Sequence, residues 1–377
     1  MGLRLQQLSL TNFRNYDSLL LRDIGALTIF VGPNAVGKTN IIEGIDLLTA
    51  ISSFRNPKIQ QIMKWDSDFT RLQASLTDGS RELEITLQIQ EAKKTYQLNG
   101  KVKRIHDLKG ILPAVCFSPD DLNLIKGSQS IKRNAIDLLG SQLSANYYAV
   151  RKDYEKILRQ KNRVLKEGVQ AEYLASINEV LISIGAQLSF KRAEVFSKLS
   201  PYICDYYHMI TGCTERVELA YIPSWEESDQ EVFTSHSFTT DKARQSLQTA
   251  LVLYQERERE SKRTLLGPQN DTIEFFIEGK NAGIYGSQGQ QRSLVLSFKL
   301  AEVSLIQNIL GQKPVLLLDD VMSELDSVRR TALIQFISDD IQTFITTTHL
   351  EYFSEELLTR AHIIHLDKNQ CGMTVVN

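Results

Sequence analysis

The chain has 377 residues and is nearly neutral, with 43 Lys or Arg against 45 Asp or Glu and a formal net charge of −2. A permanent, non-specific DNA coat carries a basic excess over the whole domain, so this balance excludes that class. Hydrophobic residues make up 42% and charged residues 23%. Such values are those of a globular chain with a large core, which excludes disordered and fibrous classes, and the length suggests two or three domains.

Neither export nor a membrane is indicated. The start, MGLRLQQLSL, has no long apolar core before a cleavage site, and Gln6 stands where a myristoylation signal needs Ser or Thr. No run approaches the roughly eighteen apolar residues of a membrane span. Four scattered cysteines without a CxxC pair argue against a disulfide framework and a zinc ribbon. A metal site at Cys204, His208 and Cys213 is disfavoured because no fourth ligand lies nearby.

The first hundred residues alternate between strand and helix patterns. Residues 3–10 alternate apolar and polar side chains, and the apolar run 27–31 ends at a turn cluster, so both segments predict strands. Apolar side chains at helical spacing in 41–48 predict a helix. Residues 71–98 predict a β meander with two hairpin signals. These signals are Asp78-Gly79 and Asn99-Gly100.

The middle of the chain is helical, and the end returns to an α/β pattern. Segments 128–166 and 171–200 have helical periodicity, with one extended interruption at 215–223. The later continuous apolar run PVLLL predicts a parallel strand buried on both faces. We therefore predict an α/β domain split in sequence, made of residues 1–115 and 266–377, with a mainly helical insertion at 116–265.

A phosphate-binding motif lies at 32–39, where GPNAVGKT fits GxxxxGK[ST] between a predicted strand and a predicted helix. In such a loop the backbone N–H groups and the helix dipole bind phosphates, Lys reaches the β and γ phosphates, and the Thr hydroxyl binds magnesium. We therefore predict ATP and Mg²⁺ as cofactors. The predicted ligands here are Gly32, Asn34, Gly37, Lys38 and Thr39.

Two carboxylates end the buried run VLLLDD at 315–320. We predict that Asp319 holds magnesium, directly or through water, and that Asp320 orients the attacking water. Lys38 and Asp319 are far apart in sequence, as expected if a whole domain is inserted between them. Closer to Asp319, GSQGQQR at 286–292 begins an amphipathic helix and predicts a second anion site. One chain with two phosphate sites indicates a nucleotide shared with a partner subunit.

This order of elements, with SQGQ as a signature and SELD at 323–326 as a D-loop, resembles the ABC-type ATPases of chromosome maintenance, the SMC group. Within that group the chain resembles, from end to end, the RecF family of bacterial recombination mediators. The resemblance is carried by NFRNY at 12–16, FSPDDL at 117–122, Lys126-Gly127, Lys132-Arg133, Asp137, Tyr154, TLLGP at 264–268, YGSQGQQR at 285–292, LLLDDVMSELD at 316–326 and QTFITTT at 342–348.

The resemblance implies an ABC-type P-loop ATPase head with an inserted helical arm and no long coiled coil. It implies an ATP-driven homodimer that clamps duplex DNA near single-stranded gaps or junctions in replication, recombinational repair and the response to DNA damage. It also implies RecR as a partner, RecO and RecA acting downstream, and a cytoplasmic location at the nucleoid. The residue roles it implies are catalysis by Lys38 and Asp320, nucleotide contacts from Arg14, Asn15, Ser287, Gly289 and Gln290, and coupling of the two sites by Asp326.

Some positions depart from the family pattern. Ala35-Val36 replaces a glycine and a small or polar residue, and Gln269-Asn270 replaces the usual His-Arg after TLLGP. His349 stands where transporter-type ABC ATPases have a switch histidine, although a histidine at a strand end is commonly structural. Asp320 is one methylene shorter than the usual ABC glutamate, so we predict slow ATP hydrolysis. The resemblance implies that this hydrolysis depends on DNA.

The expected DNA contact is segment 126–166 together with the outer face of the head. This segment holds ten Lys or Arg residues and three acidic residues, although a charge run is more often a solvated helix face. Two alternatives remain open: an SMC-like head that acts on a protein partner, and a nucleotide-gated scaffold without significant hydrolysis. The intact Lys38, Thr39, Asp319 and Ser287 disfavour the scaffold.

Overall fold

The computed structural model describes residues 2–168, 171–212, 215–225, 239–337, 340–367 and 374–376. The chain forms two compact units. The first comprises Met1–Asp121, Met209–Thr211 and Phe298–Asn377, and the second comprises Leu122–His208 and Gly212–Ser297. The boundary after Asp121 lies close to the one predicted after residue 115. The boundary after Ser297 lies later than the one predicted after residue 265. Strand β10 (Thr272–Ile277) falls in the second unit because it pairs along its whole length with β9 (Val217–Ile222) of that unit.

One sheet of the first unit has seven strands, ordered β15-β2-β1-β4-β5-β6-β7. Its strands are β1 (Arg4–Phe13), β2 (Tyr16–Leu21), β4 (Phe69–Thr77), β5 (Glu82–Gln90), β6 (Lys93–Leu98), β7 (Lys101–Lys103) and β15 (Thr374–Val376). The predicted meander is confirmed. Asn99 and Gly100 take φ values of 50° and 73° between β6 and β7, as a two-residue hairpin turn requires. Strand β2 was not predicted.

The other sheet of the first unit is parallel and has the order β14-β3-β13-β12-β8. Its strands are β3 (Leu27–Val31), β8 (Ala114–Phe117), β12 (Val315–Asp319), β13 (Thr343–Thr347) and β14 (His362–His365). Every residue of β3, β12 and β13 is buried. For β12 the continuous apolar run predicted this burial. The carboxyl ends of these strands lie at one edge of the sheet, where ligands bind in open α/β sheets.

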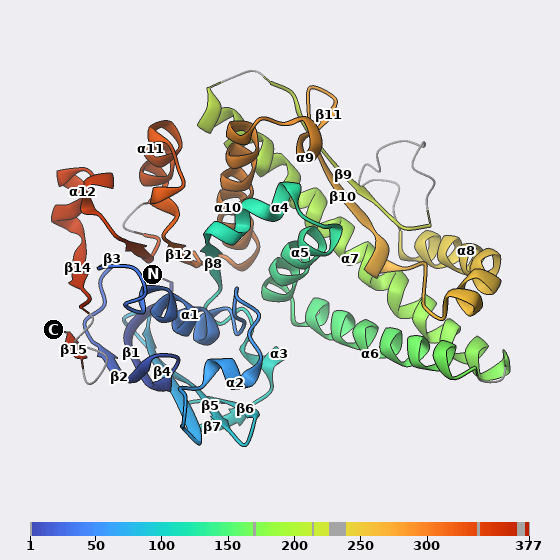
Figure 1. Ribbon diagram of the computed structural model, residues 1–377, viewed down its shortest axis with the longest axis horizontal. Coiled ribbons are helices and arrows are strands. Elements are labelled where there is room, and N and C mark those ends of the chain that lie inside the picture. Colours follow the sequence, from blue (N-terminus) through green and yellow to red (C-terminus); the bar gives the residue numbers. More distant parts are fainter. Residues whose placement is uncertain are drawn as a thin grey trace. The chain divides into compact units, whose positions relative to one another are not determined.

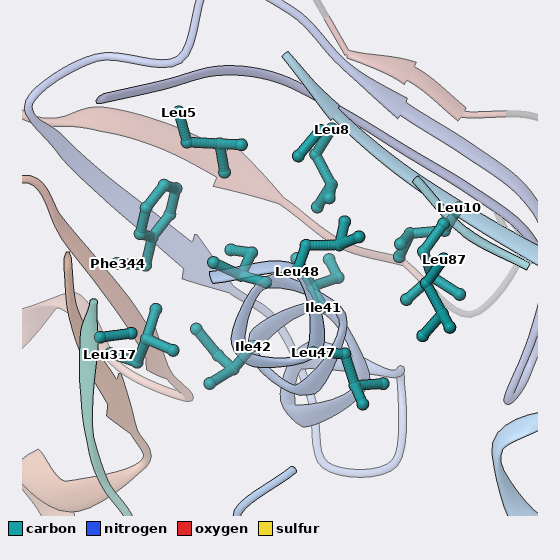
Figure 2. Packing of buried hydrophobic residues seen from close by; sticks show 14 of the residues in the cluster. Leu5, Leu8, Leu10, Ile41, Ile42, Leu47, Leu48, Leu87, Leu317 and Phe344 are labelled. Atoms are coloured by element: carbon teal, nitrogen blue, oxygen red, sulfur yellow. The ribbon is translucent and has the colours of Figure 1, made fainter. Parts of the chain in front are cut away.

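Helix α1 (Lys38–Thr49) packs between the two sheets of the first unit (Figure 2). In the close-up, Leu8, Leu10 and Leu87 of the seven-stranded sheet lie on one side of the helix, and Leu317 and Phe344 of the parallel sheet lie on the other. The helix itself contributes Ile41, Ile42, Leu47 and Leu48 to this core. Its amino terminus, where the phosphate motif ends, is therefore fixed by packing on both sides.

The second unit is mainly helical, as predicted for the insertion (Figure 1). Its helices are α4 (Asn123–Lys126), α5 (Gln129–Leu143), α6 (Ala145–Glu167), α7 (Ala171–Thr211, except its last three residues), α8 (Thr240–Ser261) and α9 (Ala282–Tyr285). Strands β9, β10 and β11 (Lys280–Asn281) form a sheet. Helix α10 (Gln288–Leu310) begins in this unit and ends in the first. The first unit also holds α2 (Ile59–Ile62), α3 (Ile105–Leu108), α11 (Ser327–Phe336) and α12 (Glu355–Arg360).

Helix α10 is, by length and composition alone, the one described helix apolar enough to cross a membrane, with a mean hydropathy of 1.3. However, 72% of the 18-residue stretch with this hydropathy is buried inside the protein. A core helix of a globular protein has the same properties, so α10 is read as a core helix.

A buried charge network holds the second unit together. The Arg192 guanidinium on α7 donates to both carboxylate oxygens of Asp137 on α5, at 2.9 and 3.0 Å, and to the Pro268 carbonyl at 2.7 Å. It also lies 3.4 Å from the Asp271 carboxylate, which is fully buried. Burial raises the pKa of Asp137, but the charge and hydrogen bonds of Arg192 outweigh it and lower the pKa below its ordinary value.

The segment that departs from the family pattern after TLLGP belongs to this network. Gln269 accepts a hydrogen bond from the Tyr154 hydroxyl and donates to the Leu266 carbonyl at 3.1 Å. Asn270 donates to the Leu265 carbonyl at 2.6 Å. Both amides therefore close the loop on itself, a structural role that neutral hydrogen-bonding side chains can fulfil.

Candidate nucleotide-binding site

The phosphate motif forms the turn between β3 and α1, and its glycines are required by close approaches. Gly37 has φ 109°, and a Cβ there would lie 2.6 Å from both the Asn15 amide nitrogen and the Tyr16 hydroxyl. A Cβ on Gly32 would lie 2.4 Å from the Leu366 carbonyl oxygen. Ala35, which departs from the family pattern, takes a left-handed conformation with φ 66°. The departure therefore keeps a turn that a glycine would adopt with less strain.

Lys38 lies against the inside of this turn. Its Nζ donates hydrogen bonds to the carbonyls of Gly32, at 2.6 Å, and Pro33, at 2.9 Å, and the residue is 7% exposed. Burial lowers the pKa of Lys38, while the charges of Asp320 and Asp319 act in the opposite direction. The predicted cation and the predicted carboxylates are therefore neighbours in the first unit.

Asp319 ends β12 and is almost fully buried. Its Oδ1 accepts a hydrogen bond from the Thr346 hydroxyl at 2.8 Å. Burial raises its pKa, and hydrogen bonds from Thr346 and Thr39 and the charge of Arg55 partly offset that rise. Thr39 and Asp319, the two predicted magnesium ligands, are thus in contact. Strand β13 separates β12 from β3, so the site spans three adjacent strand ends.

Asp320 follows in a left-handed conformation, with φ 54° and ψ 21°. Its backbone N–H donates to the Thr346 hydroxyl oxygen at 2.9 Å. Its pKa is raised, first by burial and then by the charge of Glu324, while Lys38 and His349 lower it. The Oδ1 atom of Asp320 is buried and has no hydrogen-bond partner within the described residues. This carboxylate therefore has an acceptor available at the strand ends.

Asn15 and Arg14 reach the motif from the end of β1, in different ways. The Asn15 amide donates to the Val36 carbonyl at 3.4 Å and accepts from the Asn40 amide at 2.6 Å. The Arg14 guanidinium instead forms a two-pronged ion pair with Glu43, at 2.8 and 2.7 Å. Asn15 therefore contacts the phosphate turn directly, whereas Arg14 is held by a fully buried carboxylate on α1.

Arg55 is a candidate that the sequence interpretation missed. Its guanidinium donates to the Asn40 amide oxygen at 2.9 Å and lies 3.5 Å from Glu43. Its charge lowers the pKa of Asp319. No motif marks Arg55, because its neighbours come from α1 and from the end of a distant strand. It brings a second guanidinium to the site.

Asp326 and His349 lie on the loops that follow β12 and β13. The Asp326 carboxylate caps α11 by accepting from the Arg329 backbone N–H at 3.0 Å, and it also pairs with the Arg329 guanidinium. The His349 ring contacts Tyr352 edge to face, with centroids 6.1 Å apart. His349 also lowers the pKa of Asp320, so its ring lies within electrostatic reach of that carboxylate.

The signature residues belong to the second unit, at the start of α10. The Ser287 N–H donates to the Gln290 side-chain oxygen at 2.8 Å, and the Gln290 N–H donates to the Ser287 hydroxyl at 3.2 Å. The Gln290 amide also donates to Glu215 at 2.9 Å. This reciprocal capping fixes the turn around Gly289 while Ser287 stays exposed. The helix start thus presents a hydroxyl to solvent.

The basic segment 126–166 is less uniform than its sequence suggests. Lys161 is buried and pairs with Glu258 at 2.6 Å, and Lys132 is buried and pairs with Glu274 at 3.3 Å. The exposed cations of α6 instead recur every three or four residues, so they share one face of the helix. They are Lys152, Lys156, Arg159, Arg163 and Lys166.

Comparison with known proteins decides the family. A family model described as the RecF/RecN/SMC N terminal domain matches residues 4–371. The DNA replication and repair protein RecF of Halalkalibacterium halodurans is 33% identical over 371 residues, which cover 97% of this chain and 98% of that protein. The protein of the same name from Geobacillus sp. (strain WCH70) is 34% identical over 365 residues, 95% and 96% of the two chains.

The chain belongs to the RecF family.

Solved structures agree with this assignment. A structure of the recombination mediator protein RecF-ATP in the RecFOR pathway has a TM-score of 0.84 and 29% identity, and one of RecF-ATPrS has a TM-score of 0.85 and 28% identity. Each covers 94% of both chains. An Smc head domain from Pyrococcus furiosus shares the fold, with a TM-score of 0.53 and 15% identity. The predicted fold, an ABC- and SMC-type ATPase head with a helical insertion, is confirmed.

The metal site that the sequence disfavoured, at Cys204, His208 and Cys213, is only partly described by the structure. Cys213 lies outside the described residues. Cys204 donates to the Val217 carbonyl at 3.5 Å, and the His208 ring bonds the Glu215 carbonyl at 2.8 Å. Among the residues with assigned positions, no group of three His, Cys, Asp or Glu is placed to hold a metal.

Proposed function

We propose that the protein is an ATP-dependent DNA-binding ATPase of replication and recombinational repair. In this proposal ATP joins two copies head to head, and the dimer clamps duplex DNA near gaps or junctions and helps to load the recombinase. The main support for this proposal is that two distant parts of the chain meet at the strand ends of one sheet. They bring together Lys38 and Thr39 with Asp319 and Asp320. Related RecF structures with ATP support the choice of nucleotide.

The residues of the first unit fit ATP and magnesium. Mg²⁺ usually keeps several waters and binds through one or two carboxylates and the phosphates, so Thr39 and Asp319 suffice as protein ligands. The bound ion neutralises charge on the phosphates. Lys38 and the amides of the turn bind the phosphates. Asp320 Oδ1, which has no hydrogen-bond partner among the described residues, accepts a hydrogen bond from the attacking water. Arg55 adds positive charge beside Asp319.

Hydrolysis in this proposal is slow and depends on DNA. Asp320 is shorter than a glutamate and is held by its neighbours, so it orients water without reaching far from the strand end. The exposed Ser287 and the capped turn at Gly289 and Gln290 bind the γ phosphate of the partner's nucleotide, and Asp326 couples the two sites. A turnover of many ATP per second contradicts this part of the proposal.

The DNA contact is the basic face of α6, which consists of Lys152, Lys156, Arg159, Arg163 and Lys166, together with the outer face of the head. Five cations on one helix face follow a phosphate backbone without reading bases, so binding is not sequence-specific. RecR is the proposed partner, with RecO and RecA acting downstream, because related structures are placed in the RecFOR pathway. The proposed location is the cytoplasm, at the nucleoid when DNA is bound.

The test is binding to a gapped duplex at physiological salt with ATP, with ADP and without nucleotide, recording DNA occupancy and protein stoichiometry together. Binding that requires ATP and places two chains on each DNA supports the clamp. Equal, weak binding in all three states overturns it and favours an SMC-like head that acts on a protein. ATP-gated dimerisation without measurable hydrolysis favours the nucleotide-gated scaffold.

Reversing three charges on the basic face of α6 should weaken DNA binding for every sequence alike. We expect Lys152→Glu, Lys156→Glu and Arg159→Glu together to make the slope of log affinity against log salt concentration shallower. The expected change corresponds to the loss of about two to three phosphate contacts. The measurement is fluorescence anisotropy across a salt series. The matched control reverses Arg257, Arg259 and Lys262 at the end of α8, where signs are mixed. An unchanged salt slope in the first variant refutes this placement.

A further inference from the structure

Thr346 joins the two carboxylates of the site. It lies on β13, directly opposite Asp319 in the register with β12, and its side chain is fully buried. The hydroxyl donates to Asp319 Oδ1 at 2.8 Å and accepts from the Asp320 N–H at 2.9 Å. One hydroxyl therefore bonds the side chain of the first aspartate and the backbone of the second.

These two bonds fix the peptide that connects the aspartates. Asp320 has a left-handed backbone, which L residues with a Cβ rarely adopt unless the surroundings hold them there. Its N–H is held at two points, since the Thr346 carbonyl also accepts from it at 3.2 Å. Because the backbone conformation sets the direction of the Cα–Cβ bond, these contacts decide where the Asp320 carboxylate points.

The direction matters because Asp320 keeps a buried Oδ1 without a hydrogen-bond partner among the described residues. The charged side chains that act on it are Lys38, Glu324 and His349, from three different segments. We propose that Thr346 is a positioning residue for ATP hydrolysis, whose hydroxyl holds the Asp320 carboxylate in line with the attacking water. This inference rests on the proposed function and assigns Thr346 no contact with the nucleotide.

The experiment compares three variants of the full chain. Thr346→Val removes the hydroxyl at nearly constant volume, and Thr346→Ser keeps it. Thr343→Val is the matched control, because Thr343 is equally buried on the same strand but bonds the Ile341 carbonyl at 3.0 Å, at the other end of β13. We expect Thr346→Val to lower kcat by at least about tenfold. Thr346→Ser and Thr343→Val should stay within about threefold of the wild type.

Two further readouts separate positioning from general damage. ATP affinity of Thr346→Val, measured by nucleotide titration without turnover, should stay within about twofold, because the turn and Lys38 still bind the phosphates. Its ATP-bound dimer, followed by light scattering, should persist longer than that of the wild type. If Thr346→Val keeps the wild-type kcat, or if Thr343→Val loses as much kcat as Thr346→Val, the inference about Thr346 is wrong while the proposed function stands. A wild type that neither hydrolyses ATP nor dimerises overturns the proposed function, and the inference with it.

Discussion

Lys38→Ala should abolish ATP-dependent DNA binding and lower ATP hydrolysis by about 100- to 1,000-fold. The Lys38 ammonium is the cation of the turn, and it lies beside the two carboxylates that the hydrolysis step requires. Without it, the negative charge that develops on the transferred phosphoryl group loses a preorganised cationic partner. DNA occupancy with ATP should fall to the value measured with ADP.

The measurement combines a coupled ATPase assay with the gapped-duplex titration. Lys38 donates hydrogen bonds only to carbonyls of its own loop among the described residues, so the variant should fold and give an unchanged circular dichroism spectrum. Lys101→Ala is the matched control, since Lys101 is an exposed lysine on the edge strand β7 of the same unit. ATP-gated binding that survives in Lys38→Ala rules out the turn as the nucleotide site.

Arg192→Met should destabilise the second unit by about 3–5 kcal/mol, because it removes the guanidinium that pairs with two buried carboxylates. Asp137 loses two hydrogen bonds from the guanidinium, and the fully buried Asp271 loses its ion pair. Adding Asp137→Asn should recover part of the loss, since one of the two buried charges is then removed. The two changes therefore should not be additive.

Hydrogen exchange of the α5 and α7 amides is the suitable measurement, because a chain with two compact units need not unfold in one transition. Lys198→Met is the matched control on α7. Lys198 pairs with Glu194 at 2.7 Å, but both side chains are about half exposed, and such pairs contribute about 0–1 kcal/mol. Equal protection in the two variants contradicts a stabilising role for the buried network.

The sequence determined those features that contiguous residues encode. The phosphate turn needs its glycines and Lys38 within eight positions, so the motif names its own ligands. The hairpin at Asn99-Gly100 follows from the positive φ values that these two residues tolerate. The strand ending in Asp319 follows from a continuous apolar run, which only a doubly buried parallel strand requires.

The burial of Lys161 is only partly encoded in the sequence, and the count of charges in segment 126–166 missed it. Lys161 falls on the same helical repeat as the buried positions Val150, Tyr154 and Ile157, which places it on the inner face of α6. A charge count cannot separate it from the exposed Arg159 or Lys166, since the count ignores which face each residue occupies. Periodicity gives the face, but it does not give the partner, Glu258, that makes the burial possible.

Only the tertiary structure decided the contacts between distant segments. The Thr346 hydroxyl bonds Asp319 because β13 lies beside β12 in a fixed register. Arg55 lies near Asp319 because α1, which it contacts, packs between the two sheets. Arg14 pairs with Glu43 for the same reason. The pairing of β9 with β10 likewise places Thr272–Ile277 in the second unit. Local patterns fix backbone shape and burial within one element, whereas the partner of a side chain depends on how the elements pack.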